Sequence, residues 1–547
     1  MNKHFFPLTV CLMIGVLGTL VAYRPTSKPA PPHYNVLFIG TDDWKPVAGC
    51  YSDDGDVQIR TPNIDRLAGR GTVFWRNYCQ QAVCAPTRAS LLTGQRPDYT
   101  RVWDLQTQIR DMNPTILTMP QHFRQQGYVT AGIGKIFDYR SVDKSDDSLS
   151  WSLPYYRLGP SDYPAGFEPP YRAYQNPQTR RSIEHYVAEA ATKGIAAGLP
   201  RQRYAQQRFS PFDESEDIPD GAYTDGAMAR KAQRIIKQLA DQNQPNRTGG
   251  PAARPFFLAV GFRSPHLPFV APKKYWDLYD RSKLPTAAYQ QKSKNPVDVA
   301  YQPSGELVDL YTGTQSEKFQ KGFAPQPDSV QQRLIHGYYA SVSYMDAQIG
   351  LLMDALKTNG LDKNTIVVLW GDHGWHLGDH GMWCKHTNFE QATRAPLIIA
   401  APGFRAGQKT RSLTEFVDIF PTLCDLTGIK TPDALAGKSL VPILRKPTEQ
   451  VKTYAVSQYP RDGDKVMGYA IRTDRYRYVA WFEHEFRKNR VMAGSKPKAV
   501  ELYDYRKDPN ETVNVANDKA FESVAGQHAQ LLREFLQNQS QPMASTK

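Results

Sequence analysis

The sequence is poor in cysteine. Six cysteines in 547 residues are too few for a fold held together by disulfides at this length; they stand at positions 11, 50, 79, 84, 384 and 424. The chain must instead bury a large hydrophobic core, and its length suffices for one large domain and a smaller one. The sequence leaves open one disulfide among the cysteines other than Cys11 and Cys84.

The chain also lacks a nucleic-acid-binding motif and any basic run interleaved with aromatic residues, although its formal net charge is +13. Without residues 1–24, which hold Lys3, Arg24 and no acid, two positive charges are lost and the value is +11. A positive surface suits an anionic partner. We therefore expect no nucleic acid as a partner, whereas a sulfated polysaccharide would meet the same electrostatic requirement.

No internal repeat is found, and the longest apolar run lies at the N-terminus. Residues 8–22 are apolar and follow a short basic head, which is typical of a secretory signal peptide. We favour a signal peptide over residues 1–24, with a membrane anchor as the alternative. Residues 25–33 form a Pro-rich linker. Either kind of leader would place the remaining chain outside the cytoplasm, so we expect a periplasmic or secreted protein.

Short apolar runs alternate with helical patterns over most of the chain. Continuous apolar runs predict strands that are buried on both faces, as in a parallel sheet, and they cover residues 35–41, 128–134, 255–262, 365–371 and 395–400. Helices are expected at 118–126, 222–242, 333–356 and 414–426. Residues 140–225 and 280–330 show no sustained period, and the first stretch is interpreted as loops that frame a substrate cleft.

The last part of the chain has a different pattern. Strand-like pieces at 454–458, 467–473 and 476–481, with a helix near 524–537, predict a small antiparallel sheet. The fold class is therefore α/β, with a central, mostly parallel sheet in a large domain at 34–435. A smaller α+β subdomain is expected at 436–547.

Polar residues follow the predicted strands, at the edge where open α/β sheets bind ligands. Asp42 and Asp43 would repel each other unless a cation lay between them, which favours a metal site over an Asp-rich turn. Asp372 and His373 repeat this design, and carboxylates with one imidazole suit a hard cation. The glycine-rich context of the neighbouring histidines at 376 and 380 argues against a zinc cluster.

Two more strand ends carry a basic side chain. Lys135 and His266 are predicted ligands of an anion, although a solvated lysine and a structural loop histidine are the ordinary alternatives. The segment C-A-P-T-R at 84–88 predicts the start of a short helix that Gly94 closes. Cys84 would then lie at a helix N-terminus, which favours a nearby anion, with Arg88 on the same face. The alternative is a small buried cysteine.

This C-x-P-x-R segment, followed by L-T-G, resembles the signature of the type I sulfatases, which belong to the alkaline-phosphatase-like superfamily. Further shared stretches run from residue 35 almost to the C-terminus, among them T-P-N-I-D at 61–65, D-H-G-W at 372–375 and S-Q-Y-P-R at 457–461. Within the family the chain is most similar to the iduronate-2-sulfatase group. The resemblance implies a sulfuric ester hydrolase in which a formylglycine-generating or sulfatase-maturating enzyme oxidises Cys84 to formylglycine.

The resemblance also implies roles for the other residues. One Ca²⁺ would be held by five ligands: Asp42, Asp43, Cys84, Asp372 and His373. Arg88 would steady the hydrated formylglycine. Lys135, His266 and Lys385 would bind the sulfate oxygens, and His266 or Lys385 would protonate the leaving alcohol.

Some positions depart from the family pattern. The G-K-x-F-H segment of the family ends here in Asp138, which predicts slower turnover of the sulfated intermediate, or its rescue by a neighbouring group, and faster turnover for Asp138→His. Lys45 replaces an arginine and His386 a tyrosine on the substrate side. Trp375 is either a sugar-stacking platform or part of the core.

The expected substrate is a sulfated oligo- or polysaccharide, with a uronic acid 2-sulfate as the first guess. Two other functions remain open at this point. One is a phosphatase or phosphodiesterase of the same superfamily, which would carry a Ser or Thr nucleophile and two zinc ions. The other is a non-catalytic binder of sulfated glycans, made inert by Asp138. The intact C-x-P-x-R segment favours the sulfatase.

Overall fold

The fold is described from a computed structural model. It describes Met1 and residues 34–52, 58–143, 146–242, 254–314, 325–463, 465–488 and 491–540. The chain divides into two units, Met1–Pro32 and His33–Lys547. Apart from Met1, the predicted signal peptide (1–24) and linker (25–33) lie outside the described residues. None of the helices in the described part combines the length and the apolarity needed to cross a bilayer.

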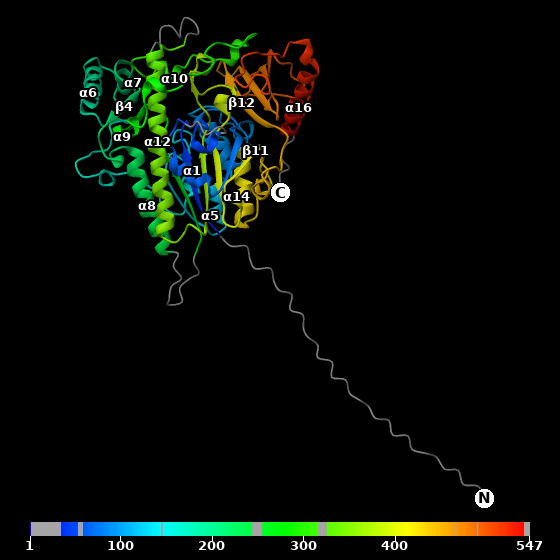
Figure 1. The fold of residues 1–547 in the computed structure, drawn as a ribbon, viewed down its shortest axis with the longest axis horizontal. Helices are drawn as coiled ribbons and strands as arrows, with labels where there is room; N and C mark the ends of the chain where they lie inside the picture. Colours follow the sequence, from blue (N-terminus) through cyan, green and yellow to red (C-terminus); the bar gives the residue numbers. More distant parts are fainter. Residues whose placement is uncertain are drawn as a thin grey trace. The chain divides into compact units, whose positions relative to one another are not determined.

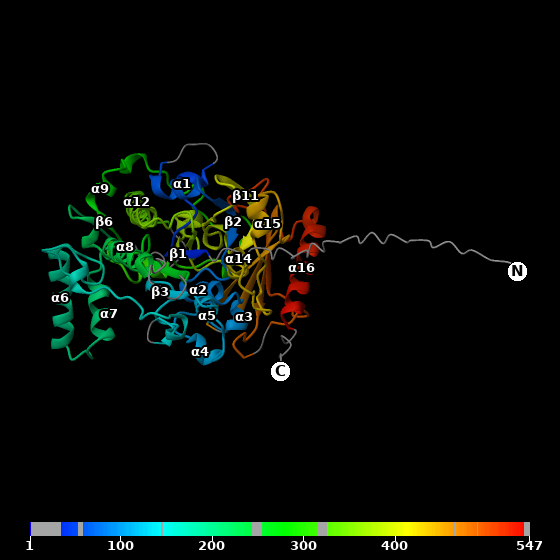
Figure 2. The same ribbon diagram turned by 90° about the horizontal axis from the view of Figure 1, so that it is seen from below.

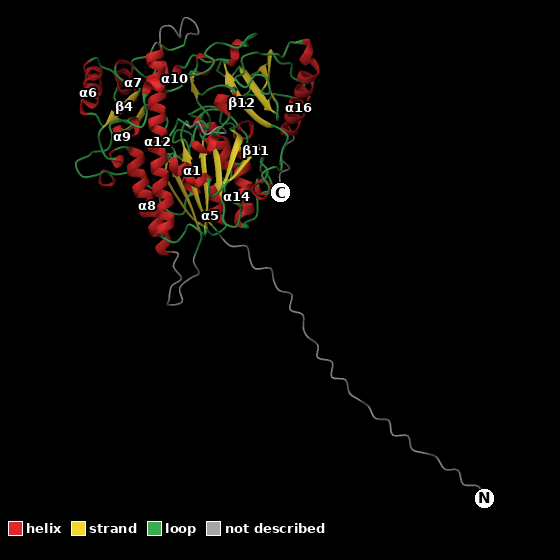
Figure 3. Cartoon of the chain, viewed as in Figure 1, coloured by secondary structure: helices red, strands yellow, loops and turns green. Residues whose placement is uncertain are grey.

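A seven-stranded sheet forms the centre of the second unit (Figure 3). Its order is β11-β2-β10-β7-β1-β5-β3, and only β10 runs antiparallel to its neighbours. The strands are β1 (Asn35–Thr41), β2 (Thr72–Tyr78), β3 (Val129–Gly134), β5 (Phe256–Gly261), β7 (Thr365–Gly371), β10 (Leu397–Ala400) and β11 (Gln408–Glu415). The prediction of a central, mostly parallel sheet is confirmed.

The side chains of β1 alternate between two helix layers, which lie on opposite faces of the sheet (Figures 1 and 2). Leu37 and Ile39 belong to one hydrophobic core, Val36 and Phe38 to the other. The first core includes α1 (Pro62–Ala68), α8 (Thr224–Gln242) and α12 (Asp328–Thr358). The second includes α2 (Cys84–Thr93), α5 (Met119–Gln125) and α14 (Ile419–Thr427). Burial on both faces explains why β1 is apolar without interruption.

A second sheet is antiparallel, in the order β12-β13-β14-β15. Its strands are β12 (Ala455–Arg461), β13 (Val466–Arg472), β14 (Tyr476–Glu483) and β15 (Ala499–Asp504). The C-terminal helix α16 (Glu522–Ser540) packs on this sheet through Leu532, Phe535 and Leu536. The predicted small antiparallel sheet is confirmed, whereas the domain boundary at 435/436 stays a prediction.

The interpretation of residues 140–225 as loops is wrong in part. This stretch contains α6 (Pro177–Thr192) and α7 (Leu199–Arg208). Only Ile183 and Ala190 of α6 are buried, and α7 buries only Ala205. Helices this exposed carry no long apolar stripe, so the hydrophobic pattern does not reveal them.

The predicted helix at 414–426 begins too early. Strand β11 continues through Glu415, a short 3-10 turn follows, and α14 begins at Ile419. Glu415 is buried in the strand because it pairs with Arg96 at 2.8 Å and with Lys452 at 2.6 Å. Leu413 is the only apolar residue of β11, so no hydrophobic pattern marks this strand in the sequence.

Short elements complete the described chain. Two-stranded sheets pair β4 (Asp213–Glu216) with β6 (Phe269–Pro272), and β8 (His376–Leu377) with β9 (Trp383–Cys384). The short helices are α3 (Pro97–Thr100), α4 (Ile109–Met112), α9 (Lys273–Trp276), α10 (Gly305–Val308), α13 (Glu390–Thr393) and α15 (Val441–Arg445). The five described cysteines are all free thiols.

Candidate active site

Four neighbouring parallel strands end at one edge of the central sheet, in the order β7-β1-β5-β3. A predicted site residue follows each of them within a few positions. These residues are Asp372 and His373 after β7, Asp42 and Asp43 after β1, His266 after β5, and Lys135 after β3. The parallel register of the strands thus gathers residues that lie more than 300 positions apart in the chain.

Helix α2 begins at Cys84, as predicted. Val83 is the extended N-cap, and Gly94 ends the helix with a left-handed φ of 64°. The Cys84 side chain is only 1% exposed, and its Sγ lies 3.6 Å from Nε2 of His373. Burial and the nearby Asp42 raise the pKa of the Cys84 thiol well above its usual value. The unmodified thiol is therefore protonated at neutral pH and is a weak nucleophile.

Arg88 is completely buried one turn further along α2. Its guanidinium contacts Asp372 at 3.0 Å and Asp42 at 3.2 Å, and it also donates to the backbone carbonyl oxygens of Thr41 and Ile136. A buried charge is tolerated when its donors are satisfied in this way. Arg88 thus clamps the carboxylates that follow β1 and β7, and holds α2 at the end of the sheet.

The predicted metal ligands lie together. The ligand atoms of Asp43, Cys84 and His373 lie within 4.8 Å of one another, and so do those of Asp42, Cys84 and Asp372. The backbone N–H of Asp43 donates to Oδ1 of Asp372 at 3.0 Å, and Asp43 adopts a left-handed φ of 63° that turns the chain at this point. Several carboxylate oxygens with a single imidazole form a donor set that fits Ca²⁺.

Lys135 lies beside this cluster, with Nζ 2.7 Å from Oδ2 of Asp42. Burial alone would raise the pKa of Asp42, but the charges of Lys135, His266 and Arg88 hold this pKa well below its usual value. Asp138 is buried and accepts two hydrogen bonds of 2.8 Å from the Arg140 guanidinium. Its Oδ2 also lies 3.5 Å from Nζ of Lys135. Despite burial, these partners lower the pKa of Asp138 to about 2.

Glu306 of α10 is a site residue that sequence reasoning missed. Its carboxylate lies 2.8 Å from Nζ of Lys385, 3.1 Å from Nε2 of His266 and 2.9 Å from Nε2 of His386. It comes from the stretch 280–330, where no motif or hydrophobic period marks it. Lys385 reaches both oxygens of Asp43 at 2.9 Å, so Glu306 and the metal cluster share this cation.

The remaining predicted residues have different surroundings. Nζ of Lys45 pairs with Asp379 at 3.5 Å, and no contact joins its side chain to the cluster. Trp375 is 1% exposed and stacks on Tyr338, while Nζ of Lys385 lies 5.0 Å from the centre of its ring. This burial fits Trp375 as a core residue better than as a platform for a sugar. A role for Trp375 in substrate binding stays a prediction.

His376 and His380, for which the sequence argued against a zinc cluster, are buried in the protein core. Nε2 of His376 lies 2.9 Å from Oγ1 of Thr387, and the His380 ring packs on Phe389 with 4.5 Å between the ring centres. Burial lowers the pKa of His376 to about 3. Neither histidine belongs to a group of metal-ligating side chains in the described part of the chain.

Comparison with known families gives two matches along the chain. The family model described as Sulfatase matches residues 34–429. The model described as N-sulphoglucosamine sulphohydrolase, C-terminal, matches residues 378–539. Together they cover both sheets of the second unit, and the first includes every predicted site residue.

Relatives of similar length match over nearly the whole chain. Iduronate 2-sulfatase of Mus musculus is 32% identical, covering 93% of this chain and 96% of its own. The same enzyme of Homo sapiens is 33% identical, covering 88% and 91%. A sulfatase of Formosa agariphila is 30% identical, covering 95% and 90%.

Solved structures share the fold at lower identity. A protein solved in complex with its substrate D-glucosamine-2-N,6-O-disulfate is 20% identical, with a TM-score of 0.64 over 94% of this chain and 100% of its own. A phosphonate monoester hydrolase of Agrobacterium radiobacter is 24% identical, with a TM-score of 0.65 over 92% of this chain and 96% of its own. The fold is therefore shared by hydrolases of different esters, and fold alone does not choose between them.

Proposed function

This chain belongs to the sulfatase family and is a sulfuric ester hydrolase, and from that premise we propose that it removes sulfate from a sulfated carbohydrate by means of a formylglycine at position 84 and one calcium ion. A sulfated oligo- or polysaccharide is the substrate class that the relatives' names support. A uronic acid 2-sulfate is the first substrate to test.

One observation carries the proposal: the cysteine of the C-x-P-x-R segment lies buried among three carboxylates that are balanced by three cations. The carboxylates belong to Asp42, Asp43 and Asp372, and the cations to Arg88, Lys135 and Lys385. The carboxylates and His373 would hold Ca²⁺, with residue 84 as a further ligand. When present, the hydrated formylglycine supplies the attacking hydroxyl, and the metal lowers the pKa of that hydroxyl.

The cations of the site would bind the sulfate group. Nζ of Lys135 pairs with Asp42, and Nζ of Lys385 pairs with Asp43. Negative charge grows on the sulfuryl oxygens as the ester bond breaks, and two fixed ammonium groups stabilise that charge without reorganisation. Arg88 contributes by orienting the carboxylates, because its side-chain hydrogen bonds within the described chain go to Asp42, Asp372 and backbone carbonyls.

His266 is placed to protonate the leaving alcohol. Its Nδ1–H donates to the backbone carbonyl of Leu267, which orients the ring and turns Nε2 toward Glu306 and Asp43. The 3.1 Å contact between Nε2 and Glu306 requires a proton on Nε2 as well, because a carboxylate can only accept, so His266 is a positively charged imidazolium in this arrangement. The geometry therefore favours His266 as the general acid, with Glu306 holding its proton in place until transfer.

Two further parts of the proposal rest on sequence. A formylglycine-generating or sulfatase-maturating enzyme is the expected partner, because residue 84 is encoded as cysteine. The apolar N-terminal run favours a signal peptide and hence a periplasmic or secreted location.

The decisive experiment is the mass of the peptide that contains residue 84, taken from protein made in a host with the modifying machinery. We expect the aldehyde in place of the thiol, together with sulfate release from sulfated saccharides and none from matched phosphate esters. A known sulfatase expressed in parallel is the control. An unmodified thiol beside a modified control would overturn the formylglycine mechanism, and glycan binding without sulfate release would support the non-catalytic binder.

A further inference from the structure

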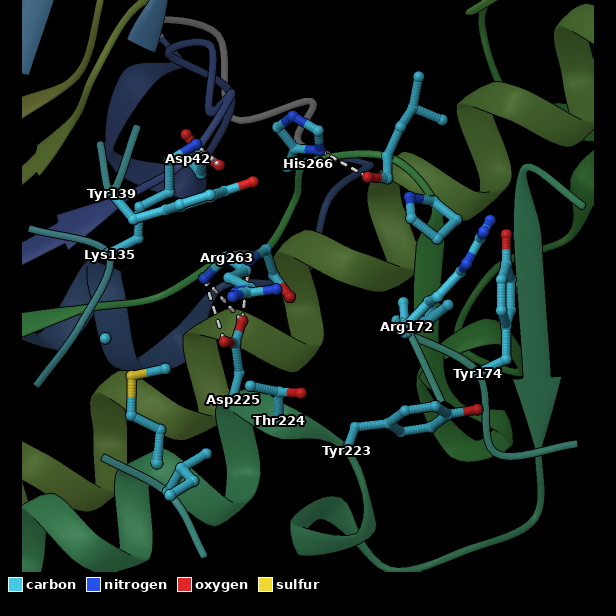
Figure 4. A pocket seen from close by; sticks show the side chains of 18 of the residues that line it. Asp42, Lys135, Tyr139, Arg172, Tyr174, Tyr223, Thr224, Asp225, Arg263 and His266 are labelled. Atoms are coloured by element: carbon cyan, nitrogen blue, oxygen red, sulfur yellow. Dashed lines mark hydrogen bonds and ion pairs between the residues drawn. The ribbon is translucent and has the colours of Figure 1, made fainter. Parts of the chain in front are cut away.

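A cavity of about 730 Å³ opens beside the active site (Figure 4). Asp42, Lys135 and His266 line it, so the cavity is continuous with the cluster that would bind the sulfate group. Its volume lies within the range of about 300–1,000 Å³ that is usual for ligand pockets. A single sulfate group fills only a small part of such a space, so the remainder is available to other parts of the substrate.

The lining of this cavity is positively charged. Five cationic side chains and two carboxylates line it: Lys135, Arg140, Arg157, Arg172 and Arg263 against Asp42 and Asp225. Both carboxylates are buried and already occupied. Asp42 pairs with Lys135 and Arg88, and Asp225 accepts the backbone N–H groups of Arg263 at 3.0 Å and Ser264 at 2.8 Å. The cavity therefore presents more positive charge than its own acids neutralise.

Two of these cations form no ion pair within the described chain. Arg140 pairs with Asp138, and Arg157 with Asp146. By contrast, the guanidinium groups of Arg172 and Arg263 form no ion pair with any described carboxylate. Arg172 donates only to the backbone carbonyl of Gln202, at 2.7 Å. Arg263 has Asp225 as an acidic neighbour, but this carboxylate accepts backbone N–H groups and not the guanidinium. A guanidinium outside an ion pair offers forked donors that match a sulfate or carboxylate group.

Rigid elements position both arginines. The two backbone hydrogen bonds to Asp225 fix the chain just after β5 to the start of α8, and Arg263 stands at that junction. Arg172 lies in the segment before α6, beside Tyr174 and Tyr223. In Figure 4, Arg263 lies between the side of the cavity that holds Asp42 and Lys135 and the side that holds Arg172.

Two tyrosines belong to the wall of the cavity near Arg172. Tyr223 donates its hydroxyl to Glu214 at 2.8 Å, and Tyr174 donates its hydroxyl to the carbonyl of Pro211. Both hydroxyls are thus occupied, and the two residues are only 1% and 2% exposed, so these tyrosines are fixed parts of the cavity wall beside Arg172.

We propose that Arg172 and Arg263 form a second anion-binding subsite, which holds a sulfate or carboxylate on the saccharide unit next to the one that loses its sulfate. We call this pair the arginine subsite. It rests on the proposed function, because the scissile sulfate must lie at Lys135 and His266. The enzyme would then prefer a substrate of at least two units with an anionic group on each.

The test compares four small substrates with Arg172→Gln, Arg263→Gln and the double variant. The substrates are a sulfated monosaccharide and three disaccharides whose second unit carries a sulfate, a carboxylate or no charge. For each single variant we expect kcat/KM on the matching charged disaccharide to fall about tenfold, mainly through KM. Turnover of the monosaccharide and the uncharged disaccharide should change by less than about twofold. The charged disaccharide that responds identifies the anion.

Arg405→Gln serves as the matched control, because Arg405 is exposed and lies outside the cavity. Equal losses on all four substrates would overturn the subsite, since they would mean that the arginines support the catalytic cluster. Unchanged rates on all four would overturn it as well. If the wild-type protein cleaved none of them, the proposed function would fail instead, and calorimetric binding of the disaccharides to the wild-type protein and the double variant would still test the subsite.

Discussion

Each charged side chain of the active site is balanced by a group of opposite charge. Lys135 after β3 pairs with Asp42 after β1, and Lys385 pairs with both Asp43 and Glu306 of α10. Removing one group takes a counter-charge from particular neighbours, and buried unpaired charges are costly. The effect of each substitution can therefore be predicted from the partner that it leaves behind.

Asp138 shows this most clearly. The family resemblance alone predicts faster turnover for Asp138→His, but the Arg140 ion pair changes the expected result of that single exchange. A histidine would leave the Arg140 guanidinium unpaired beside Lys135, which we expect to cost about 1–3 kcal/mol of stability. We therefore expect Asp138→His to lower both the melting temperature and kcat, and Asp138→His/Arg140→Gln to recover both in part.

A double-mutant cycle of kcat and melting temperature measures this coupling, with Arg140→Gln as the second single variant. If Asp138→His alone equals or exceeds the wild type in both measurements, Arg140 does not depend on Asp138, and the simpler prediction from the family holds.

Glu306 is the second residue with a clear consequence. Glu306→Gln would remove the negative charge that holds the proton on His266 and balances Lys385, so we expect kcat to fall about 10- to 100-fold with little change in KM. Glu306→Asp keeps the charge and should lose less. Steady-state kinetics give the measurement, and Asp298→Asn, which changes an exposed acid that pairs with Lys292 and with no residue of the cluster in the described chain, is the control. A rise in KM at constant kcat would instead make Glu306 a substrate-binding residue.

The sequence predicts the site residues that stand at strand ends, and it misses Glu306, which lies on the short helix α10. Asp42, Asp372, Lys135 and His266 follow apolar runs, so a simple rule about parallel sheets brings them together. Glu306 follows no such run, and its place depends on how the stretch 280–330 folds over the sheet. Long-range packing of this kind leaves no local pattern to read.

At the scale of elements, the junction between α1 and α12 gives a pH-dependent prediction. The carboxylate of Asp346 on α12 accepts hydrogen bonds from the backbone N–H groups of Asn63 and Ile64 at the start of α1. Burial raises the pKa of Asp346 to about 6, although these hydrogen bonds oppose the shift. The folded protein therefore holds a proton there between pH 4 and 6 that the unfolded chain releases.

It follows that this group stabilises the fold at low pH and loses that contribution as the pH rises from about 4 to about 6, by about 3 kcal/mol at most. Asp346→Asn does not titrate. We expect the melting temperature of the wild type to fall relative to that of Asp346→Asn over this interval. Parallel melting curves from pH 4 to 7 check the prediction, and a constant difference between the two proteins would contradict it.

Elements buried on both faces are predictable, and exposed or polar ones are not. The strands β1, β5 and β7 stand out because each is apolar without interruption. The helices α6 and α7 do not, because almost none of their residues is buried. Strand β11 ends in the buried acid Glu415, whose partners lie far away in the sequence. Prediction of secondary structure from the sequence thus succeeds where a hydrophobic pattern marks the element, and it fails where tertiary contacts determine the structure.

At the scale of the whole molecule, the proposed calcium ion would join parts that are distant in the chain. Its ligands follow β1 and β7, two neighbouring central strands, and Cys84 begins the helix α2 on one face of the sheet. An ion bound there stabilises the folded state only, because the unfolded chain does not hold these ligands together. Calcium binding should therefore raise the stability of the entire second unit.

We expect added Ca²⁺ to raise the melting temperature of chelator-treated protein, with a stabilisation of about 2.7 kcal/mol when free calcium is about 100 times the dissociation constant. Differential scanning calorimetry and calcium titration calorimetry measure this without any assay of activity. Asp372→Asn should abolish the response, because it removes one ligand from β7, and Asp298→Asn should keep it. A wild-type protein whose melting temperature and heat of titration do not respond to calcium would exclude a calcium site at these carboxylates, and the three cations around them would then be their permanent partners.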